Sequence, residues 1–302
     1  MENLLKISDL TKEEITDILN EADQLKFDLK NHIPHPYLKG KTLGMIFHKV
    51  STRTRVSFET GMYQLGGQAL FLSADDLQIE RGEPIQDTAR TLSRYVDGIL
   101  IREYSQADLE KFAEYSTVPV INGLTDFSHP CQVLADLLTI REYKNIFEGL
   151  KLCFIGDGNN MANSIIMGAL KVGMAVSCAC PAKYHPDESV LEFAKKTGDF
   201  EITESMEEAI KDADVVVTDS WYSMGRETNI EQRKIDFSGY TVSTELMKLA
   251  KPDAMLMHCL PAHRGEEITE EAFEAHANEI FDEAENRLHA QKAVLVKLLA
   301  NR

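Results

Sequence analysis

The 302-residue sequence has few basic side chains, few cysteines and no long apolar run. Its 32 Lys and Arg residues stand against 49 Asp and Glu residues, and the formal net charge of -17 excludes a broad surface for nucleic acid or acidic membranes. No apolar run approaches the roughly 18 residues that cross a bilayer. The start, MENLLKISDLTKEE, lacks the basic and then apolar pattern of a secretory signal. Five cysteines, an odd number, are poor material for a disulfide framework. We therefore expect a cytoplasmic protein without nucleic-acid or membrane partners.

Short β-rich runs alternate with helical patterns, such as Arg55–Leu65 and Asp87–Val96, along most of the chain. This alternation is typical of parallel sheets flanked by helices. We expect an α/β protein with two similar-sized domains, each a parallel sheet flanked by helices, joined by long helices with the active site in the cleft. The expected strands are Thr42–Phe47, Ala69–Leu72, Gly98–Ile101, Val118–Ile121, Leu152–Ile155, Ala175–Ala179, Ile202–Thr203, Val215–Thr218 and Met255–His258.

Two long helical patterns indicate where the domains connect. The first runs from His129 to about Tyr143 and is followed by a break at Gly149. The second begins near Ala284, and Lys292 interrupts its apolar stripe. We expect a first domain of residues 1–145, on which the helix at about 284–302 packs, and a second domain of residues 146–283. Open α/β sheets bind ligands at the carboxyl ends of their strands, so the turns after the strands are candidate sites.

The segment HKVSTRTRVSFETG follows the first expected strand and starts a helix. Ser51 and Thr52 suit the capping position, where free backbone N–H groups favour an anion. Arg53 and Arg55 place cations at a helix end whose dipole disfavours them, which indicates that an anion binds between them. The alternative is a solvated basic turn that pairs with surface carboxylates. We expect phosphate binding, because hydroxyls, N–H groups and arginines occur together here.

Four motifs occur in order and far apart: STRTR after a strand, HPCQ at the start of the middle helix, DSWYSMG after a later strand, and HCLP in a late loop. Together they resemble the aspartate/ornithine carbamoyltransferase family, and most closely its ornithine-using members. The likeness covers essentially the whole chain, including FETGMYQLGGQALFL, DTARTLSRY, GDGNNMANS and EAENR. It implies transfer of the carbamoyl group from carbamoyl phosphate to the δ-amino group of L-ornithine, giving L-citrulline and phosphate. Such a reaction serves arginine biosynthesis or, in reverse, arginine catabolism.

The resemblance assigns one group of residues to carbamoyl phosphate, with Arg53, Arg102, His129 and Cys259 as catalytic residues. Carbamoyl phosphate is a small dianion with one electrophilic carbon, so it needs donors on its phosphate and on its carbonyl oxygen. The alternative for His129 is a helix-capping residue without a chemical role. The implied contacts are Ser51, Thr52, Arg53 and Thr54 for the phosphate, Arg102 and His129 for the carbonyl oxygen, Gln132 for the carbamoyl NH2 group, Pro130, Cys131, Cys259, Leu260 and Arg287 beside them, and Gln78 from a neighbouring subunit.

The resemblance assigns ornithine to the second half of the chain. Asp219 and Ser223 are implied to bind its α-ammonium group, the backbone N–H of Met224 its carboxylate, and Asn160 its amino-acid end. Asp219 by itself could equally be a helix-capping residue. We expect the loop from Asp219 to Gly225 to be a mobile lid. Members that use aspartate need basic residues for its second carboxylate, and this loop supplies only Arg226 nearby.

A nicotinamide dehydrogenase is a competing interpretation of the turn after Leu152–Ile155. Gly156 and Gly158 begin a dinucleotide-binding pattern, but Met161 stands where Gly or Ala is required. The next strand is followed by Pro181-Ala182-Lys183, without the acidic residue that binds a ribose. We therefore expect no nucleotide cofactor.

The resemblance also implies that Cys259 and the Leu260 carbonyl contact the carbamoyl amide and the incoming amine, with a cis bond before Pro261. The other cysteines are expected to be small buried apolar residues. Cys178 and Cys180 could hold a metal from one strand face, but no further ligands accompany them, so we expect no metal.

The family implies a homotrimer or a multiple of trimers. The alternative acceptors are putrescine, an acylated ornithine and aspartate, and the other alternative is an inactive binding paralogue.

Overall fold

The computed structural model describes residues 1–222 and 229–300. The chain divides into two compact units, Met1–Ala135 with Asn286–Arg302, and Asp136–Glu285. Each unit is built around its own parallel sheet flanked by helices, which confirms the expected α/β class and the presence of two domains. The chain passes from one unit to the other inside two helices, α5 (Pro130–Lys144) and α12 (Ala277–Leu299).

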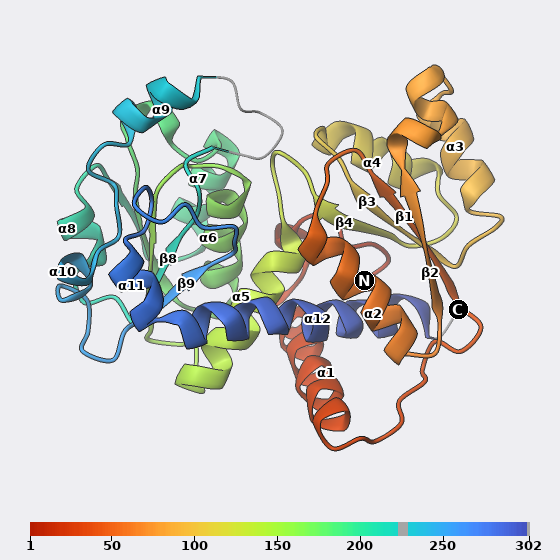
Figure 1. The fold of residues 1–302 in the computed structure, drawn as a ribbon, viewed down its shortest axis with the longest axis horizontal. Helices are drawn as coiled ribbons and strands as arrows, with labels where there is room; N and C mark the ends of the chain where they lie inside the picture. The colour runs from red at the N-terminus through yellow and green to blue at the C-terminus, as the bar shows by residue number, and fades with distance from the viewer. Residues whose placement is uncertain (223–228, 301–302) are drawn as a thin grey trace. The chain divides into compact units, whose positions relative to one another are not determined.

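The first unit contains a four-stranded sheet in the order β2-β1-β3-β4 (Figure 1). The strands are β1 (Thr42–Phe47), β2 (Gln68–Ser73), β3 (Gly98–Arg102) and β4 (Val120–Leu124). On one face, Ile46 and Ile99 pack with Ala89 and Phe112, which come from α3 (Ile85–Leu92) and α4 (Gln106–Tyr115). Successive strand residues point to opposite faces, so the neighbour of Ile99 faces away from this core.

The opposite face of the same sheet is covered by α12. A Cβ added at Gly98 would lie 2.8 Å from Leu299, so the helix rests directly on this strand. Helix α2 (Thr52–Gln64) also approaches α12 closely, because a Cβ at Gly61 would lie 3.2 Å from the Lys292 side chain. The remaining elements of this unit are η1 (Ile7–Asp9), α1 (Lys12–Lys30), α2 (Thr52–Gln64), η2 (Ala74–Asp76) and η3 (Gln78–Arg81).

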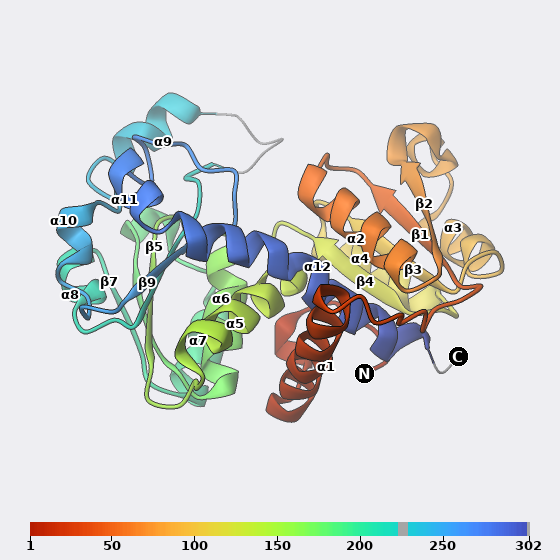
Figure 2. The same ribbon diagram turned by 60° about the horizontal axis from the view of Figure 1, so that its bottom comes forward.

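The second unit contains a five-stranded parallel sheet in the order β7-β6-β5-β8-β9. Helices α6 (Asn160–Val172) and α7 (Glu188–Thr197) lie on one side of it, and α8 (Met206–Ile210), α10 (Thr244–Met247) and α11 (Glu270–Ala275) on the other (Figure 2). The strands are β5 (Lys151–Ile155), β6 (Ala175–Ala179), β7 (Phe200–Thr203), β8 (Val215–Thr218) and β9 (Met255–His258). The other elements are η4 (Ala182–Tyr184) and α9 (Ile230–Asp236).

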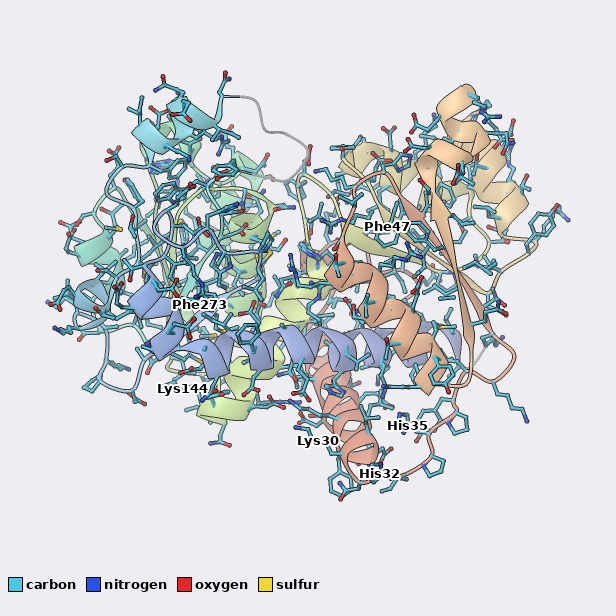
Figure 3. The ribbon with its side chains drawn as sticks, viewed as in Figure 1. Lys30, His32, His35, Phe47, Lys144 and Phe273 are labelled. Carbon is cyan, nitrogen blue, oxygen red and sulfur yellow. The ribbon has the colours of Figure 1, made fainter. Side chains whose placement is uncertain are left out.

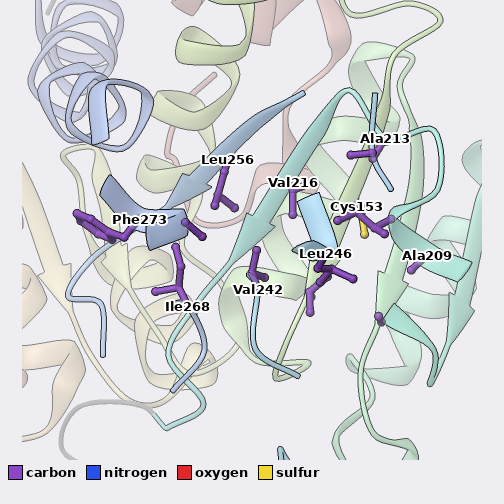
Figure 4. Packing of buried hydrophobic residues seen from close by; sticks show 14 of the residues in the cluster. Cys153, Ala209, Ala213, Val216, Val242, Leu246, Leu256, Ile268 and Phe273 are labelled. Carbon is purple, nitrogen blue, oxygen red and sulfur yellow. The ribbon is translucent and has the colours of Figure 1, made fainter. Parts of the chain in front are cut away.

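A buried apolar core joins this sheet to α8, α10 and α11. It packs Cys153, Val216 and Leu256 of the strands against Leu246 and Phe273 of the helices (Figure 4). All of these side chains are less than a tenth exposed. The core therefore fixes the strands whose carboxyl ends carry the candidate residues of this unit.

The observed strands match the expected ones to within two or three residues at each end, whereas two helices differ more. Helix α3 ends at Leu92 and not at Val96, with Ser93 as its C-cap residue. Helix α12 begins at Ala277, a full turn and more before the expected Ala284.

Within residues 1–222 and 229–300, no helix has the length and apolar character that a membrane crossing needs.

Candidate active site

The candidate residues of the first unit gather at the carboxyl ends of β1 and β3. The strand order β2-β1-β3-β4 changes direction between these two strands, and open α/β sheets bind ligands at such a point. Phe47 ends β1 (Figure 3) and pairs in register with Arg102, which ends β3. The His48 N–H then donates to the Arg102 carbonyl at 2.9 Å. The chain enters α2 a few residues later, so the sheet places the start of α2 beside Arg102.

Ser51 caps α2, as the sequence predicts. Its Oγ accepts from the Thr54 N–H at 3.2 Å and donates to Thr54 Oγ1 at 3.1 Å. Thr54 is completely buried, whereas Thr52 is exposed. The helix that follows is long enough to carry a dipole, whose positive end favours an anion at Ser51–Thr54.

Arg287 connects two other predicted residues of the first unit, so that three of them form one group. It is 3% exposed, its Nη1 donates to Gln132 Oε1 at 2.6 Å, and its Nη2 donates to Thr54 Oγ1 at 3.2 Å. The three residues come from α12, α5 and α2, which are far apart in the sequence. The structure thus joins the EAENR, HPCQ and STRTR motifs in one buried hydrogen-bonded group.

His129 precedes Pro130, the first residue of α5, and is buried. Burial is the largest cause that lowers the pKa of His129 well below its usual range. The charges of Arg287, Arg102 and Arg53 lower the pKa further, in that order. His129 is therefore a neutral imidazole in a strongly positive environment at physiological pH. Such a site favours a bound anion and leaves the imidazole able to donate a hydrogen bond.

Arg55 does not belong to this group, so the expectation that Arg53 and Arg55 bind one anion together is wrong. Its Nε donates to Glu59 at 3.0 Å on an exposed part of α2, and its guanidinium lies 3.7 Å from the centre of the Phe71 ring. Residues two apart on a helix point in nearly opposite directions. For Arg55, the surface pairing that we considered as the alternative is what the structure shows.

Cys131 and Gln78 differ in their surroundings from the other predicted residues of this unit. The Cys131 thiol is buried against the Asn122 carbonyl at 3.4 Å, and burial raises its pKa to about 12. This thiol therefore stays protonated and packs as a small apolar group. Gln78 starts the short helix η3 and is exposed.

The candidate residues of the second unit also lie where the strand order changes direction, between β5 and β8. Asp219 follows β8 and is 9% exposed. Its Oδ2 accepts from Asn159 Nδ2 at 2.8 Å, and its Oδ1 accepts from the Ser220 N–H at 2.8 Å. Asn159 also caps α6 through the N–H groups of the two residues after Asn160. The family resemblance points to the buried Asn160 and not to Asn159, although the position of Asn159 before a helix is a capping signal.

Cys259 follows β9 and faces Asp219. Its Sγ donates to Asp219 Oδ1 at 3.1 Å. Burial and the Asp219 carboxylate raise the pKa of the Cys259 thiol well above its usual range. Cys259 is therefore a hydrogen-bond donor at neutral pH and not a thiolate nucleophile.

A buried histidine fixes the backbone after Cys259. His258 Nδ1 accepts from the Leu260 N–H at 2.9 Å, and His258 Nε2 lies 3.0 Å from Glu267 Oε1. Because Nδ1 accepts, Nε2 carries the proton and donates to the fully buried Glu267. The Leu260–Pro261 peptide bond is cis, as the family resemblance implied.

A further pair, Asp157 and Arg233, was missed in the sequence analysis. Arg233 Nη1 lies 2.7 Å from Asp157 Oδ2 and also donates to the Trp221 carbonyl. Burial raises the pKa of Asp157 to about 6, against the opposing effect of Arg233. The pair links the loop after β5 to the loop after β8. No local sequence signal could have shown it, because the partners are 76 positions apart.

The remaining predicted contacts for ornithine, Ser223 and Met224, lie outside the described residues. The same holds for Gly225 and Arg226. Trp221 lies two positions before that segment. It is buried and stacks on Phe237 with ring centres 5.7 Å apart.

Comparison with known proteins gives a consistent result over the whole chain. The family model described as "aspartate/ornithine carbamoyltransferase, carbamoyl-P binding domain" matches residues 2–142, and the one described as "Asp/Orn binding domain" matches residues 148–298. An ornithine carbamoyltransferase from Carboxydothermus hydrogenoformans is 54% identical, covering 98% of this chain and 97% of the relative. Another from Pyrococcus abyssi is 53% identical, covering 98% and 95%.

Solved structures agree with these relatives. The ornithine carbamoyltransferase of Pyrococcus furiosus has a TM-score of 0.95 at 51% identity, covering 100% of this chain and 98% of that one. The anabolic enzyme of Campylobacter jejuni has a TM-score of 0.94 at 44% identity, with all of both chains covered.

Proposed function

The chain belongs to the aspartate/ornithine carbamoyltransferase family, and on this premise we propose that it transfers the carbamoyl group of carbamoyl phosphate to the δ-amino group of L-ornithine. The products are L-citrulline and phosphate. The observation that carries the proposal is the neutral, buried His129 under the charges of Arg53, Arg102 and Arg287. This arrangement suits a small dianion that also carries a carbonyl oxygen.

We assign carbamoyl phosphate to the first unit and the amine to the second. The start of α2 and Arg53 bind the phosphate, and Arg102 and His129 donate to the carbonyl oxygen. His129 donates from its neutral form, because its lowered pKa prevents protonation of the ring near pH 7. Gln132 and Arg287 act as one hydrogen-bonded pair beside them. Asp219 accepts from the α-ammonium group of ornithine, and the Cys259 thiol and the Leu260 carbonyl lie close to the reacting amine.

In the proposed reaction, the uncharged δ-amine attacks the carbonyl carbon of carbamoyl phosphate. The C–N bond forms, and negative charge moves onto the carbonyl oxygen, where the arginines and His129 stabilise it. Collapse of this intermediate breaks the C–O bond to phosphate, which takes up the proton that the amine loses and is released as the HPO4 dianion. The residues thus act through position and fixed charge, with no thiolate nucleophile.

We also propose that the protein is a cytoplasmic homotrimer in which Gln78 reaches the phosphate of a neighbouring subunit. Gln78 is exposed on its own unit, in a segment rich in acidic residues. The adjoining surface of α2 and β2 exposes apolar side chains that a subunit contact would cover. They are Val56, Tyr63, Leu70 and Phe71.

The test is citrulline formation from carbamoyl phosphate with a panel of amines: ornithine, putrescine, N-acetylornithine and aspartate. We expect ornithine to be preferred over each of the others by orders of magnitude in kcat/KM. A preference for putrescine, which lacks the α-amino acid group, would contradict the assignment of Asp219. No turnover of any amine would contradict catalysis itself and favour a binding paralogue.

A further inference from the structure

Gln291 lies one helical turn after Arg287 on α12 and is 1% exposed. A primary amide that is buried this completely needs partners for both its oxygen and its NH2 group. The structure supplies both, and each partner belongs to the carbamoyl phosphate residues or touches them.

The oxygen of Gln291 accepts two hydrogen bonds from the same guanidinium group. Arg287 Nε donates to Gln291 Oε1 at 3.1 Å, and Arg287 Nη2 donates to it at 2.9 Å. Two donors from one planar group to one acceptor restrict the orientation of the guanidinium plane as well as its position. The Nη1 atom is directed to Gln132 at 2.6 Å.

The NH2 group of Gln291 connects this arginine to α2. Gln291 Nε2 donates to Ser57 Oγ at 2.5 Å, and Ser57 Oγ donates to the Arg53 carbonyl at 2.6 Å. The Arg53 carbonyl belongs to the first turn of the helix that is assigned to the phosphate. One side chain therefore relates the orientation of Arg287 to the backbone of the STRTR motif.

The charge of the residue at this position also matters. A glutamate could accept the same two hydrogen bonds, but its carboxylate would form an ion pair with Arg287 and cancel the positive charge that a dianion needs. An amide holds the guanidinium and leaves its charge available. The need for a neutral acceptor at position 291 follows from the anionic substrate.

We propose that Gln291 is a positioning residue for carbamoyl phosphate, which fixes the plane of Arg287 relative to the first turn of α2. The inference rests on the proposed function, in which Arg287 contacts carbamoyl phosphate. It adds a residue that no motif identified. An experiment can distinguish this positioning role from a role in packing alone. A packing role requires only a side chain of similar volume, whereas positioning requires an uncharged acceptor.

The experiment compares four single variants of the full chain: Gln291→Met, Gln291→Glu, Arg287→Ala and Lys292→Met. Lys292 is the matched control, because it is the next residue of α12, is fully buried and bonds His35 and Gln64 rather than Arg287. Steady-state kinetics give kcat and both KM values, and thermal unfolding gives Tm.

We expect Gln291→Met to lower kcat/KM for carbamoyl phosphate by about tenfold or more, with KM for ornithine within about twofold of wild type. Gln291→Glu should lose at least as much, although it retains the acceptor, because it cancels charge. Lys292→Met should change Tm but leave kcat/KM for carbamoyl phosphate within about twofold.

The inference is overturned if Gln291→Met keeps kcat/KM for carbamoyl phosphate within twofold, or if Gln291→Glu restores it to the wild-type value. The proposed function fails separately, if Arg287→Ala leaves kcat/KM for carbamoyl phosphate unchanged. A loss in Arg287→Ala with no loss in Gln291→Met would retain the substrate assignment and remove only the role of Gln291.

Discussion

The Nη1 atom of Arg233 lies 2.7 Å from Asp157 Oδ2 and also donates to the carbonyl of Trp221. A helix of the second unit thereby holds together two loops that follow neighbouring strands, β5 and β8. The second loop contains Asp219, the proposed partner of the ornithine α-ammonium group. The ionisation of Asp157 should consequently affect binding of the amine.

We predict two slopes in the pH profile of kcat/KM for ornithine. The δ-amine titrates near about 10.4, so its reactive free base gives a slope of about one in log kcat/KM from pH 6 to 8. The pKa of Asp157 is raised to about 6, so below that pH its protonation weakens the pair with Arg233. The slope should increase to about two. Asp157→Asn should retain a slope of about one throughout, and parallel profiles of the two proteins would contradict the prediction.

Arg53 and Arg55 form a matched pair for a test of the anion site. We predict that Arg53→Gln lowers kcat by two to three orders of magnitude, because one donor to developing negative charge is worth about 3–4 kcal/mol. Arg55→Gln should stay within about threefold of wild type, because Arg55 bonds Glu59 on the surface and such pairs contribute little. The measurement is kcat of both variants and of wild type at saturating ornithine, with circular dichroism to check folding. Equal losses in both variants would mean that general surface charge, and not the position of Arg53, matters.

His258 offers two substitutions that each preserve one of its contacts. In His258→Asn, the amide oxygen can stand near the position of Nδ1 and accept from the Leu260 N–H. In His258→Gln, the NH2 group can stand near Nε2 and donate to Glu267. We predict that both lower stability by about 1–3 kcal/mol, measured by urea unfolding. The Asn variant should retain the higher kcat, because the Leu260 backbone is assigned to a contact with the reacting amine. A Gln variant that equals or exceeds it would indicate that the bond to Glu267 is the important one.

Mixed trimers test whether Gln78 acts on a neighbouring subunit. Chains with Gln78→Ala and chains with Arg53→Gln should each be nearly inactive alone. After dissociation and equal mixing, about a quarter of the sites should contain neither change, and activity should return to that extent. The same treatment of each variant alone is the control. If mass spectrometry detects mixed trimers but no activity returns, each site is built from one chain.

Lys292 should make the free energy of unfolding depend on pH in the alkaline range. Burial lowers its pKa in the folded protein to about 8, whereas an exposed lysine titrates near about 10.4. Between these values the unfolded chain binds the proton more tightly, so wild type should gain stability relative to Lys292→Met as the pH rises from 8 to about 10. Urea unfolding of both proteins at the two pH values measures the difference. A constant difference would show that burial does not lower the pKa of Lys292.

The strands and the order of the motifs could be read from the sequence, because period, length and turn residues are local signals. Hydrogen-bond partners that lie far apart in the sequence could not be read from it. Lys292 looked like an interruption of an apolar stripe, but it is buried, because His35 and Gln64 supply acceptors from positions far away in the sequence. Gln291 and Arg233 lack a local signal for the same reason.

The candidate site was predicted in its residue types and only partly in its geometry. Arg53 and Arg55 look equivalent in the sequence, and the helical period alone could have separated them. Asn160 was named through the family resemblance, which did not point to its neighbour Asn159, the residue that caps α6. The assignment of roles to Arg102, His129 and Asp219 depended on the family resemblance, since the sequence itself gives no distances.

The first unit is assembled from two stretches of sequence, Met1–Ala135 and Asn286–Arg302, whereas the second unit is one continuous stretch. During synthesis the continuous unit can complete its sheet while the chain is still growing. One face of the other unit's sheet stays uncovered until α12 is made, because Leu299 of that helix packs on it at Gly98. The same delay applies to Arg287, so the group of residues that is assigned to carbamoyl phosphate is completed late. A nascent chain that stops short of Asn286 would carry Asp219 and Cys259 together but would lack Arg287, one of the residues assigned to carbamoyl phosphate.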